Sequence, residues 1–281
     1  MKILLTGSTG FIGGHIRSGL KEDNYLVLPF KGDITEVKDW RTNLEFGAET
    51  IICTAGIRTE GPADFKVNKG GVKSLLTALA KTSEKPKTII YISTQAVYSG
   101  LTPPLKENMP VKPATPYAKS KKEAEDIICQ IGQKNNIRTV IFRLSVVLGS
   151  GVREGNHMSG PLAIWTKNAL SGKALEVNQD GQQTRDYIHV ADVVSAILLA
   201  VRNDKVAGIF NVGGGQRVRL AEFAEWVKEA AKSNSQIVIK GGGESVNDPG
   251  DLFSDTSKIR KFGWKPQKTA QNAVSEFVSA F

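Results

Sequence analysis

Short apolar runs alternate with longer amphipathic segments through the first half of the chain. The continuous apolar runs Thr88–Ile92 and Thr139–Phe142 predict strands that are buried on both faces. The expected strands are Lys2–Thr6, Tyr25–Phe30, Thr50–Cys53, Thr88–Ser93 and Arg138–Phe142. The expected helices between them are Phe11–Leu20, Glu36–Phe46, Asp64–Lys81 and Tyr117–Lys134. Because strands and helices alternate, the pattern predicts an α/β fold with a doubly wound parallel sheet.

The pattern changes after Gly149, where the elements become shorter and more interrupted. The expected elements here are Leu162–Leu170, Ala174–Val177, Ala191–Val201, Ile209–Val212, Leu220–Ala231 and Gln236–Ile239. These segments predict a smaller C-terminal substrate-binding lobe at the carboxyl edge of the sheet. The expected main domain comprises residues 1–152 plus about 182–204, and the expected lobe comprises about 153–181 and 205–281.

A glycine-rich turn follows the first predicted strand directly. Gly7, Gly10 and Gly13 are spaced three residues apart, and an apolar helix follows them. Gly7 allows a sharp exit from the strand, Gly10 allows close approach of backbone to a pyrophosphate, and Gly13 allows close packing of the helix. Since the N-terminal N–H groups of a helix bind phosphate, the turn predicts a dinucleotide site.

Composition limits the classes of partner. The chain has 281 residues, of which 40% are hydrophobic, and its 37 basic and 28 acidic residues give a net charge of +9. The lysines are scattered without interleaved aromatic residues, which favours small anions or a solvated surface over nucleic acid. No apolar run is long enough for a membrane span, and no signal peptide fits the first residues.

The cysteines and histidines do not show the pattern of a metal site. Cys53 and Cys129 fall in a predicted strand and a predicted helix, where they are expected to act as small buried hydrophobic residues. This usage predicts a reducing, cytoplasmic setting. The three histidines lack the spacing of metal ligands, and His15 and His189 are expected to be packing residues, so no metal site is expected.

A tyrosine and a lysine four residues apart open the helix predicted after the fourth strand. Tyr117 and Lys121 share one face of that helix. A nearby ammonium group favours the phenolate, so we expect Lys121 to lower the pKa of Tyr117. Tyr117 is therefore a candidate proton acceptor and donor near neutral pH.

Taken together, these motifs resemble the extended short-chain dehydrogenase/reductases, also called NAD-dependent epimerase/dehydratases. The similar segments, in chain order, are Thr6–Gly13, Gly32–Thr35, Ala55–Gly56, Asn68, Ser93–Tyr98, Tyr117–Lys121, Gly181–Asp192, Phe210–Gly213 and Gly263–Pro266. The resemblance covers essentially the whole chain and implies a Rossmann fold that binds NAD or NADP.

The resemblance also implies roles for single residues. Tyr117 would remove or return the proton of a sugar hydroxyl, and Lys121 would hold the nicotinamide ribose. Thr94 would hydrogen-bond the reacting oxygen. The implied substrate-binding residues are Thr94, Gln95 and Arg185, of which Arg185 would contact the substrate diphosphate. The implied cofactor-binding residues are Gly7, Thr9, Gly10, Phe11, Ile12, Gly13, Lys31, Asp33, Ile34, Ala55, Gly56, Asn68, Ser93, Tyr117 and Lys121.

The chain departs from the family pattern at the end of the second predicted strand. An NAD site usually has an acidic residue there for the ribose hydroxyls, whereas this chain has Phe30 followed by Lys31. Lys31 could meet the 2′-phosphate of NADP, or be simply exposed. Asp33 is implied to meet the adenine, and a role for it at the ribose stays open.

Three further departures concern the substrate. Val146 stands where many members have a substrate-contacting Asn, and Asp248 stands where sugar epimerases often have a second diphosphate-binding Arg. Basic residues of the nearby segments, such as Arg153, could compensate. Gln95-Ala96 replaces the Asp-Glu pair of the 4,6-dehydratases, so the carboxyl groups needed to eliminate water are missing.

We therefore expect a nucleotide-sugar 4-epimerase similar to UDP-glucose 4-epimerase. The alternative is an NADP-dependent reductase of nucleotide-linked 4-keto sugars, and a distant one is a non-catalytic dinucleotide-binding regulator or an RNA-associated protein. The expected partners are a nucleotide sugar and a second copy of the chain, bound through the helices predicted at Asp64–Lys81 and Tyr117–Lys134.

Overall fold

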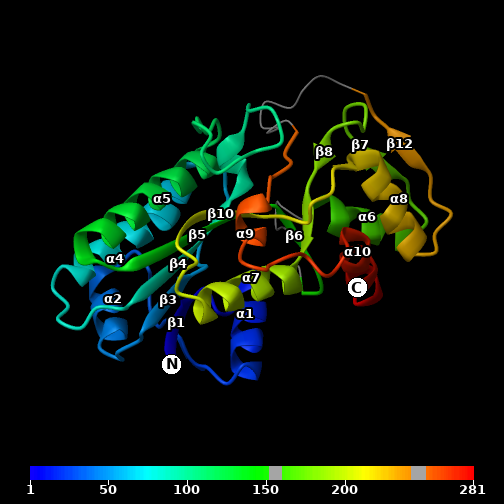
Figure 1. Cartoon of the computed structure of the whole chain (residues 1–281). Coiled ribbons are helices and arrows are strands. Elements are labelled where there is room, and N and C mark those ends of the chain that lie inside the picture. Colours follow the sequence, from blue (N-terminus) through cyan, green and yellow to red (C-terminus); the bar gives the residue numbers. More distant parts are fainter. Residues whose placement is uncertain (152–159, 242–250) are drawn as a thin grey trace. The chain divides into compact units, whose positions relative to one another are not determined.

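The computed structural model describes residues 1–151, 160–241 and 251–281 (Figure 1). The chain folds into two compact units, each built from segments that are separate in the sequence. The first unit comprises Met1–Val97, Val111–Arg143 and Val194–Phe210, and the second comprises Tyr98–Pro110, Leu144–Val193 and Asn211–Phe281. The expected assignment of cofactor binding and substrate binding to separate domains stays a prediction.

A six-stranded sheet runs through the first unit in the order β10-β5-β4-β3-β1-β2. The strands are β1 (Lys2–Thr6), β2 (Leu26–Pro29), β3 (Thr50–Cys53), β4 (Thr88–Thr94), β5 (Arg138–Leu144) and β10 (Gly208–Val212). β1 pairs in parallel with β2 on one side and with β3 on the other. The strand order therefore reverses at β1, and open α/β sheets bind ligands at the carboxyl ends of strands at such a point.

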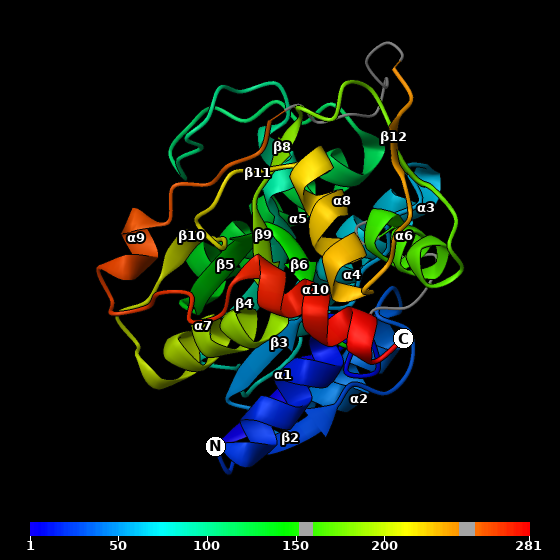
Figure 2. The same cartoon turned by 90° about the vertical axis from the view of Figure 1, so that its right-hand side faces the viewer.

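Helices cover both faces of this sheet (Figures 1 and 2). On one face α2 (Val37–Leu44), α4 (Gly70–Leu79) and α5 (Pro116–Asn135) lie side by side. On the other, α1 (Phe11–Glu22) lies beside the part of α7 (Val190–Arg202) that begins at Val194. The two helices are so close that a Cβ on Gly19 would lie 2.5 Å from a methyl group of Val194. The predicted α/β fold with a doubly wound sheet is confirmed.

The apolar runs of the sequence form the core under α2, α4 and α5. Every residue of β3 and β4 is buried, as the continuous apolar pattern predicts. The helices contribute apolar residues at helical spacing to the same cluster, which includes Leu4, Ile51, Ile89, Trp40, Leu75, Leu79, Ile128 and Ile131. This core fixes the carboxyl ends of β1, β3 and β4 relative to the helices that follow them.

The helix predicted over Asp64–Lys81 differs from the structure. It consists of a short turn, α3 (Pro62–Asp64), a π-helical segment, η1 (Phe65–Lys69), and then α4. The π-helical turn coincides with Asn68, whose side chain is 2% exposed and hydrogen-bonded to the preceding loop. Such wider turns occur mostly at functional sites, and periodicity alone does not reveal them.

Among its described residues, the second unit contains three short strand pairs. β6 (Val146–Leu148) pairs in parallel with β9 (Tyr187–His189), and β7 (Leu175–Val177) pairs in parallel with β12 (Ile237–Ile239). β8 (Thr184–Arg185) and β11 (Val218–Arg219) are antiparallel. Besides the first residues of α7, the described helices of this unit are α6 (Gly160–Leu170), α8 (Leu220–Ala230), α9 (Ser257–Arg260) and α10 (Ala270–Ser279).

Aromatic packing and a buried histidine hold the second unit together. The rings of Tyr187 and Phe223 are stacked, with their centroids 4.4 Å apart. His189 is 3% exposed, accepts the Ala191 N–H at Nδ1 and contacts Glu276 through Nε2 at 2.8 Å. Since Nδ1 accepts a hydrogen bond, the Nε2–H donates to Glu276. His189 thus serves packing, as expected.

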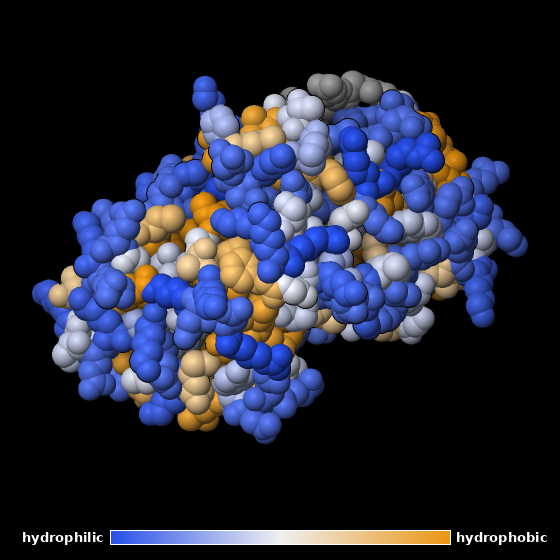
Figure 3. Space-filling model, in the orientation of Figure 1, coloured by the Kyte–Doolittle hydropathy of each residue, from blue (hydrophilic) through white to orange (hydrophobic). Residues whose placement is uncertain are grey.

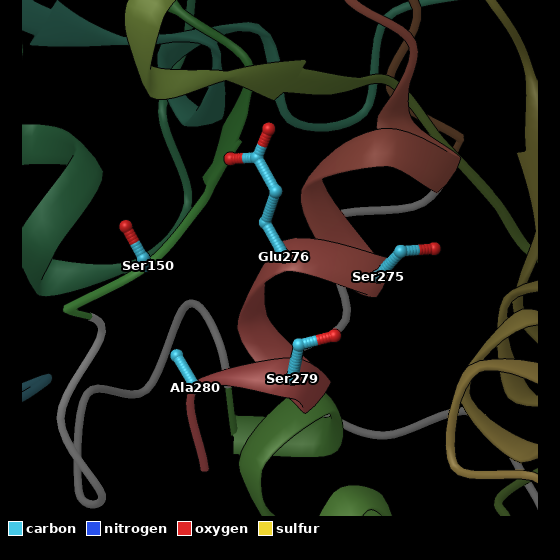
Figure 4. Close-up of a pocket in the computed structure, with 5 residues that line it drawn as sticks. All are labelled: Ser150, Ser275, Glu276, Ser279 and Ala280. Atoms are coloured by element: carbon cyan, nitrogen blue, oxygen red, sulfur yellow. The ribbon is translucent and has the colours of Figure 1, made fainter.

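A surface pocket lies beside this histidine in the second unit. It is lined by Ser150, Ser275, Glu276, Ser279 and Ala280, mostly from α10 (Figure 4). None of the predicted catalytic, cofactor-binding or substrate-binding residues lines it, so the pocket carries no part of the predicted chemistry.

The drawn molecular surface is mainly polar (Figure 3). The face drawn in Figure 3 is largely hydrophilic, with apolar residues in small groups. Among the described residues, no helix has the length and apolar character that crossing a membrane requires.

Two leucines of adjacent strands should differ strongly in how much they contribute to the free energy of unfolding. Leu4 on β1 is fully buried, whereas Leu26 on β2 is 54% exposed. Leu4→Ala should lower the free energy of unfolding by about 3 kcal/mol, because it leaves a cavity in the core. Leu26→Ala should change it by less than about 0.5 kcal/mol. Urea denaturation of both variants checks this, and equal losses would contradict the described core.

Candidate active site

Two glycines of the turn after β1 stand where a side chain would clash with the backbone. Gly7 has φ +66°, and a Cβ there would lie 2.7 Å from the backbone nitrogen of Ala55. A Cβ on Gly13 would lie 2.0 Å from the carbonyl oxygen of Gly7. Gly10 caps α1 without any side-chain hydrogen bond to the first turn. The backbone N–H groups of that turn therefore have no side-chain cap of their own, which fits a bound pyrophosphate.

The ends of β1 and β3 are fastened together beside this turn. The Thr6 hydroxyl accepts hydrogen bonds from the backbone N–H groups of Thr54 and Ala55, both at 3.1 Å, and the Thr54 hydroxyl donates to the Thr6 carbonyl at 2.6 Å. Gly56 follows, and a Cβ there would lie 2.8 Å from Oδ1 of Asn68. The predicted cofactor residues Ala55, Gly56 and Asn68 thus lie together next to the glycine turn.

The segment after β2 carries the residues that are predicted to distinguish NADP from NAD. Phe30 packs against the ring of Trp40, with centroids 4.6 Å apart, so this position serves the core. The backbone N–H and carbonyl of Lys31 are both hydrogen-bonded to the side chain of Asn43, at 3.0 and 2.8 Å. The side chain of Lys31 is exposed. Lys31 is therefore held at a defined position while its ammonium group faces solvent.

Asp33 stabilises the turn in which it lies. Its carboxylate accepts hydrogen bonds from the backbone N–H and the hydroxyl of Thr35, at 2.8 and 2.9 Å. The Thr35 N–H, and then its hydroxyl, lower the pKa of Asp33. The backbone N–H of Asp33 donates to Asp39 at 2.7 Å. Asp39 is a residue that the sequence analysis missed, although its position in the first turn of α2 is typical of an acid that stabilises a preceding loop.

The predicted catalytic residues meet where β4 ends and α5 begins. Thr115 caps α5 by accepting the Ala118 N–H, which places Tyr117 in the first turn of the helix. The hydroxyl of Thr94, the last residue of β4, lies close enough to the Tyr117 phenol to favour its phenolate. Lys121 follows one turn later on α5 and is 5% exposed. The structure therefore brings Thr94 and Tyr117 close together, with Lys121 on the same helix.

The pKa of Tyr117 depends on the groups around its phenol. Burial raises the pKa of Tyr117, while the Arg58 guanidinium and the Thr94 hydroxyl oppose that rise. Lys121 instead donates from Nζ to the Ile92 carbonyl at 2.5 Å and lies 4.4 Å from the centroid of the Tyr91 ring. Lys121 is not among the groups that most affect the pKa of Tyr117, so the expectation that Lys121 lowers this pKa stays a prediction.

Lys121 is itself strongly perturbed. Burial lowers its pKa to about 8, and the negative charge of Glu125 opposes this shift. Glu125 lies one turn further along α5 and is 1% exposed. It forms a bidentate ion pair with Arg143 of β5, at 3.0 and 2.7 Å, and accepts the Ser93 hydroxyl at 2.5 Å.

The sequence analysis missed Glu125 as part of the site. The available signal was its position four residues after Lys121 on the buried face of a predicted helix, where an acid requires a partner. Ser93, which was predicted to bind cofactor, is 4% exposed and engaged with Glu125, so its role toward a cofactor stays a prediction.

The remaining predicted substrate residues lie in both units. Gln95 is 1% exposed and follows β4 directly. Arg185 lies on β8, is partly buried and donates to the Thr184 carbonyl at 2.9 Å. Val146 is a buried residue of β6. Arg153 and Asp248 lie outside the described residues, so their expected roles stay predictions.

No metal chemistry emerges from the described part of the chain. No cluster of His, Cys, Asp or Glu side chains within it could hold a metal ion. Both cysteines are free thiols, and burial raises the pKa of Cys53 to about 12. Cys53 is buried as expected, whereas Cys129 is only partly buried.

Comparison with known proteins places this arrangement in a family. The chain is 28% identical to UDP-arabinose 4-epimerase 1 of Arabidopsis thaliana, over 95% of this chain and 76% of that protein. It is 26% identical to GDP-6-deoxy-D-mannose reductase of Pseudomonas aeruginosa, over 99% and 96%. The fold is similar to that of UDP-glucose 4-epimerase from Thermotoga maritima, solved with UDP-glucose, with a TM-score of 0.90, 25% identity and coverage of 100% and 98%.

A family model agrees with these similarities over most of the chain. The model of the NAD dependent epimerase/dehydratase family matches residues 3–213, which include the glycine turn, Thr94, Tyr117 and Lys121. The relatives above act on nucleotide sugars by their names and include both epimerases and a reductase. The chain therefore belongs to the NAD dependent epimerase/dehydratase family, enzymes of the extended short-chain dehydrogenase/reductase type that use NAD(P).

Proposed function

We propose that this enzyme is an NAD(P)-dependent nucleotide-sugar 4-epimerase that acts on UDP-sugars. The observation that carries the proposal is the position of Thr94 at the end of β4, close to Tyr117 in the first turn of α5, with Lys121 one turn along the same helix. The 4-epimerases among the relatives support the choice of reaction and of UDP-sugars as substrates.

The cofactor would be held along the carboxyl edge of the sheet. Thr9, Phe11, Ile12 and Gly13 would present backbone N–H groups to the pyrophosphate, and Gly10, whose own N–H donates to the Gly7 carbonyl, would allow its close approach. The adenosine end would meet Lys31, Asp33 and Ile34, and the nicotinamide end would meet Ala55, Gly56, Asn68, Ser93, Tyr117 and Lys121. Bound NAD(P) supplies the acceptor and donor of a hydride.

Tyr117 would move the proton in the proposed reaction. As a phenolate it would accept the proton of the sugar 4-hydroxyl while the hydride leaves C4, so a keto sugar forms. Thr94 would donate a hydrogen bond to that oxygen in both states. The keto sugar would then rotate in the site. Tyr117 would return the same proton as the hydride arrives on the opposite face of C4. Arg185 would hold the diphosphate during this rotation.

The same site disfavours dehydration of the sugar. Elimination of water needs an acid and a base beside the substrate. Gln95 and Ala96 occupy the positions after Thr94 where the 4,6-dehydratases have carboxyl groups, and neither side chain can exchange a proton at neutral pH.

A reductase of nucleotide-linked 4-keto sugars is the second candidate. The end of β2 has Phe30 in the core and the exposed Lys31 in place of an acid, an arrangement that favours the 2′-phosphate of NADP. A reductase oxidises one NADPH to NADP per turnover, and one of the relatives is a reductase.

A non-catalytic regulator or RNA-associated protein is a third, distant candidate. Such a protein has no need for Thr94, Tyr117 and Lys121, whereas this chain retains all three. The proposed homodimer through η1, α4 and α5 rests on the family resemblance alone.

One assay of the purified enzyme separates these candidates. A 4-epimerase interconverts UDP-glucose and UDP-galactose with no net change in NAD(P)H. Stoichiometric oxidation of NADPH with a 4-keto sugar, and no interconversion, would establish the reductase instead. A protein without either activity that binds RNA at physiological salt would support the third candidate.

Removing the Tyr117 hydroxyl tests the proton transfer. Tyr117→Phe should lower kcat by about 100-fold or more, because the sugar hydroxyl then has no proton acceptor. Dissociation constants for dinucleotide and UDP-sugar should change little. Tyr25→Phe, on a partly exposed tyrosine beside β2, is the matched control and should retain full activity. Retained activity in Tyr117→Phe would exclude the assigned role.

Lys31 tests the preference for NADP. If its ammonium group meets the 2′-phosphate, Lys31→Ala should weaken NADP binding by about tenfold and leave NAD binding nearly unchanged, because one charge-assisted contact is lost. The exposed Lys81→Ala removes the same charge elsewhere and is the control. Fluorescence titration with both dinucleotides gives the ratio, and an equal change for NAD and NADP would show that Lys31 is merely exposed.

A further inference from the structure

Arg58 lies against the ring of the proposed catalytic tyrosine. The central carbon of its guanidinium is 5.2 Å from the centroid of the Tyr117 ring. The side chain is 25% exposed, so solvent screens it only in part. A cation at this distance over an aromatic face is attracted to the ring, and more strongly when the ring becomes a phenolate.

Glu60 connects Arg58 with the helix that carries Tyr117. Its Oε1 accepts a hydrogen bond from the Arg58 Nε at 2.8 Å, and its Oε2 accepts the backbone N–H of Tyr117 at 3.3 Å. Glu60 has φ +55°, a left-handed conformation that is uncommon for a residue other than glycine. Local strain of this kind persists where the surrounding contacts fix the backbone.

Two buried side chains fix the loop that carries Arg58 and Glu60. Asp64, fully buried, accepts the Thr59 N–H at 2.7 Å and the Gly61 N–H at 3.3 Å. Asn68 binds both the N–H and the carbonyl of Ile57, each at 2.9 Å. The loop from 57 to 61 is therefore anchored at both ends, and Arg58 has a defined position before any ligand binds.

Charged and titratable groups face Tyr117 from every element around it. They are Arg58 and Glu60 of the loop, Asp64 of α3, Tyr91 of β4 and Lys121 of α5. Asp64 and Glu60 disfavour the phenolate, whereas Arg58 favours it more than any other charged group. Lys121 is engaged with the Ile92 carbonyl.

We propose that Arg58 is a positioning residue that, held by Glu60, stabilises the phenolate of Tyr117 by lying over its ring. The proposal rests on the proposed role of Tyr117 as proton acceptor, and it gives Arg58 an electrostatic role beside the one that the sequence predicts for Lys121. No bond is made or broken at Arg58. It shifts the protonation equilibrium of Tyr117 and fixes the plane of its ring.

A variant without the Arg58 guanidinium should differ from the wild type in the pH dependence of kcat. Loss of the guanidinium removes a contribution that lowers the pKa of Tyr117, so that pKa should rise further. Because the reactive form in sugar oxidation is the phenolate, the acidic limb of the kcat profile should move to higher pH, and kcat at pH 7 should fall by about tenfold. Activity at high pH should approach that of the wild type.

The test compares Arg58→Gln, Arg58→Lys and the control Arg41→Gln, which removes the same charge from an exposed position on α2. The pKa of Tyr117 is measured in the full-length protein without substrate, by NMR titration of 13C-labelled tyrosine. Tyr117→Phe identifies the signal. We expect Arg58→Gln to raise this pKa, Arg58→Lys to restore most of the difference and Arg41→Gln to leave it unchanged.

Two outcomes would overturn the proposal. The first is an unchanged pKa of Tyr117 in Arg58→Gln. The second is that weaker binding of NAD and NADP is the sole effect of that variant, which would make Arg58 a contact for the dinucleotide. Because the titration needs no turnover, it stays decisive even if the enzyme proves not to be a 4-epimerase. The far-ultraviolet circular dichroism of each variant shows whether it has folded.

Discussion

The side-chain amide of Asn68 joins the segments from which the candidate site is built. It binds the N–H and the carbonyl of Ile57 in the loop after β3, and its Nδ2 also donates to the Ser120 hydroxyl at 3.0 Å. Ser120 in turn donates to the carbonyl of Tyr117 at 2.7 Å. A buried amide must satisfy its polar atoms, so any movement of the loop away from α5 leaves donors and acceptors unpaired. The positions of Arg58, Glu60 and Tyr117 depend on this constraint.

Buried charged groups next to α5 affect the pKa of Lys121. Burial of an ammonium group is costly, and the low pKa of Lys121 reflects that cost. Glu125, which is paired with Arg143, lies close enough to Lys121 for its negative charge to raise the pKa of Lys121. This favours the charged ammonium form. Since both partners are almost fully buried, removal of either would leave an unpaired charge in the core, which costs more than the pair contributes.

Much of the architecture follows from local rules that the sequence exposes. The glycine turn, the buried strands β3 and β4 and the start of α5 at Thr115 and Pro116 need only periodicity, glycine geometry and capping. What could not be predicted depends on long-range contacts. The π-helical segment at Phe65–Lys69 contains Asn68, which binds a loop eleven residues earlier in the chain.

The electrostatics of Tyr117 likewise depend on tertiary structure. A spacing of four residues on a helix places Lys121 on the same face as Tyr117, but it does not show that the ammonium group turns toward the Ile92 carbonyl. Arg58 lies far from Tyr117 in the sequence, and only the folded loop brings it over the ring. Proximity in sequence therefore pointed to Tyr117 and Lys121, but it could not reveal the cation that lies over the Tyr117 ring.

In the proposed 4-epimerisation a hydride leaves C4 of the sugar and returns to the same carbon on the other face. The most direct test incubates the purified enzyme with UDP-glucose that carries deuterium at C4 and follows the products by NMR. The account predicts UDP-galactose with the deuterium still at C4 and no net formation of NAD(P)H. Absence of UDP-galactose, or its formation with loss of the deuterium, would contradict it.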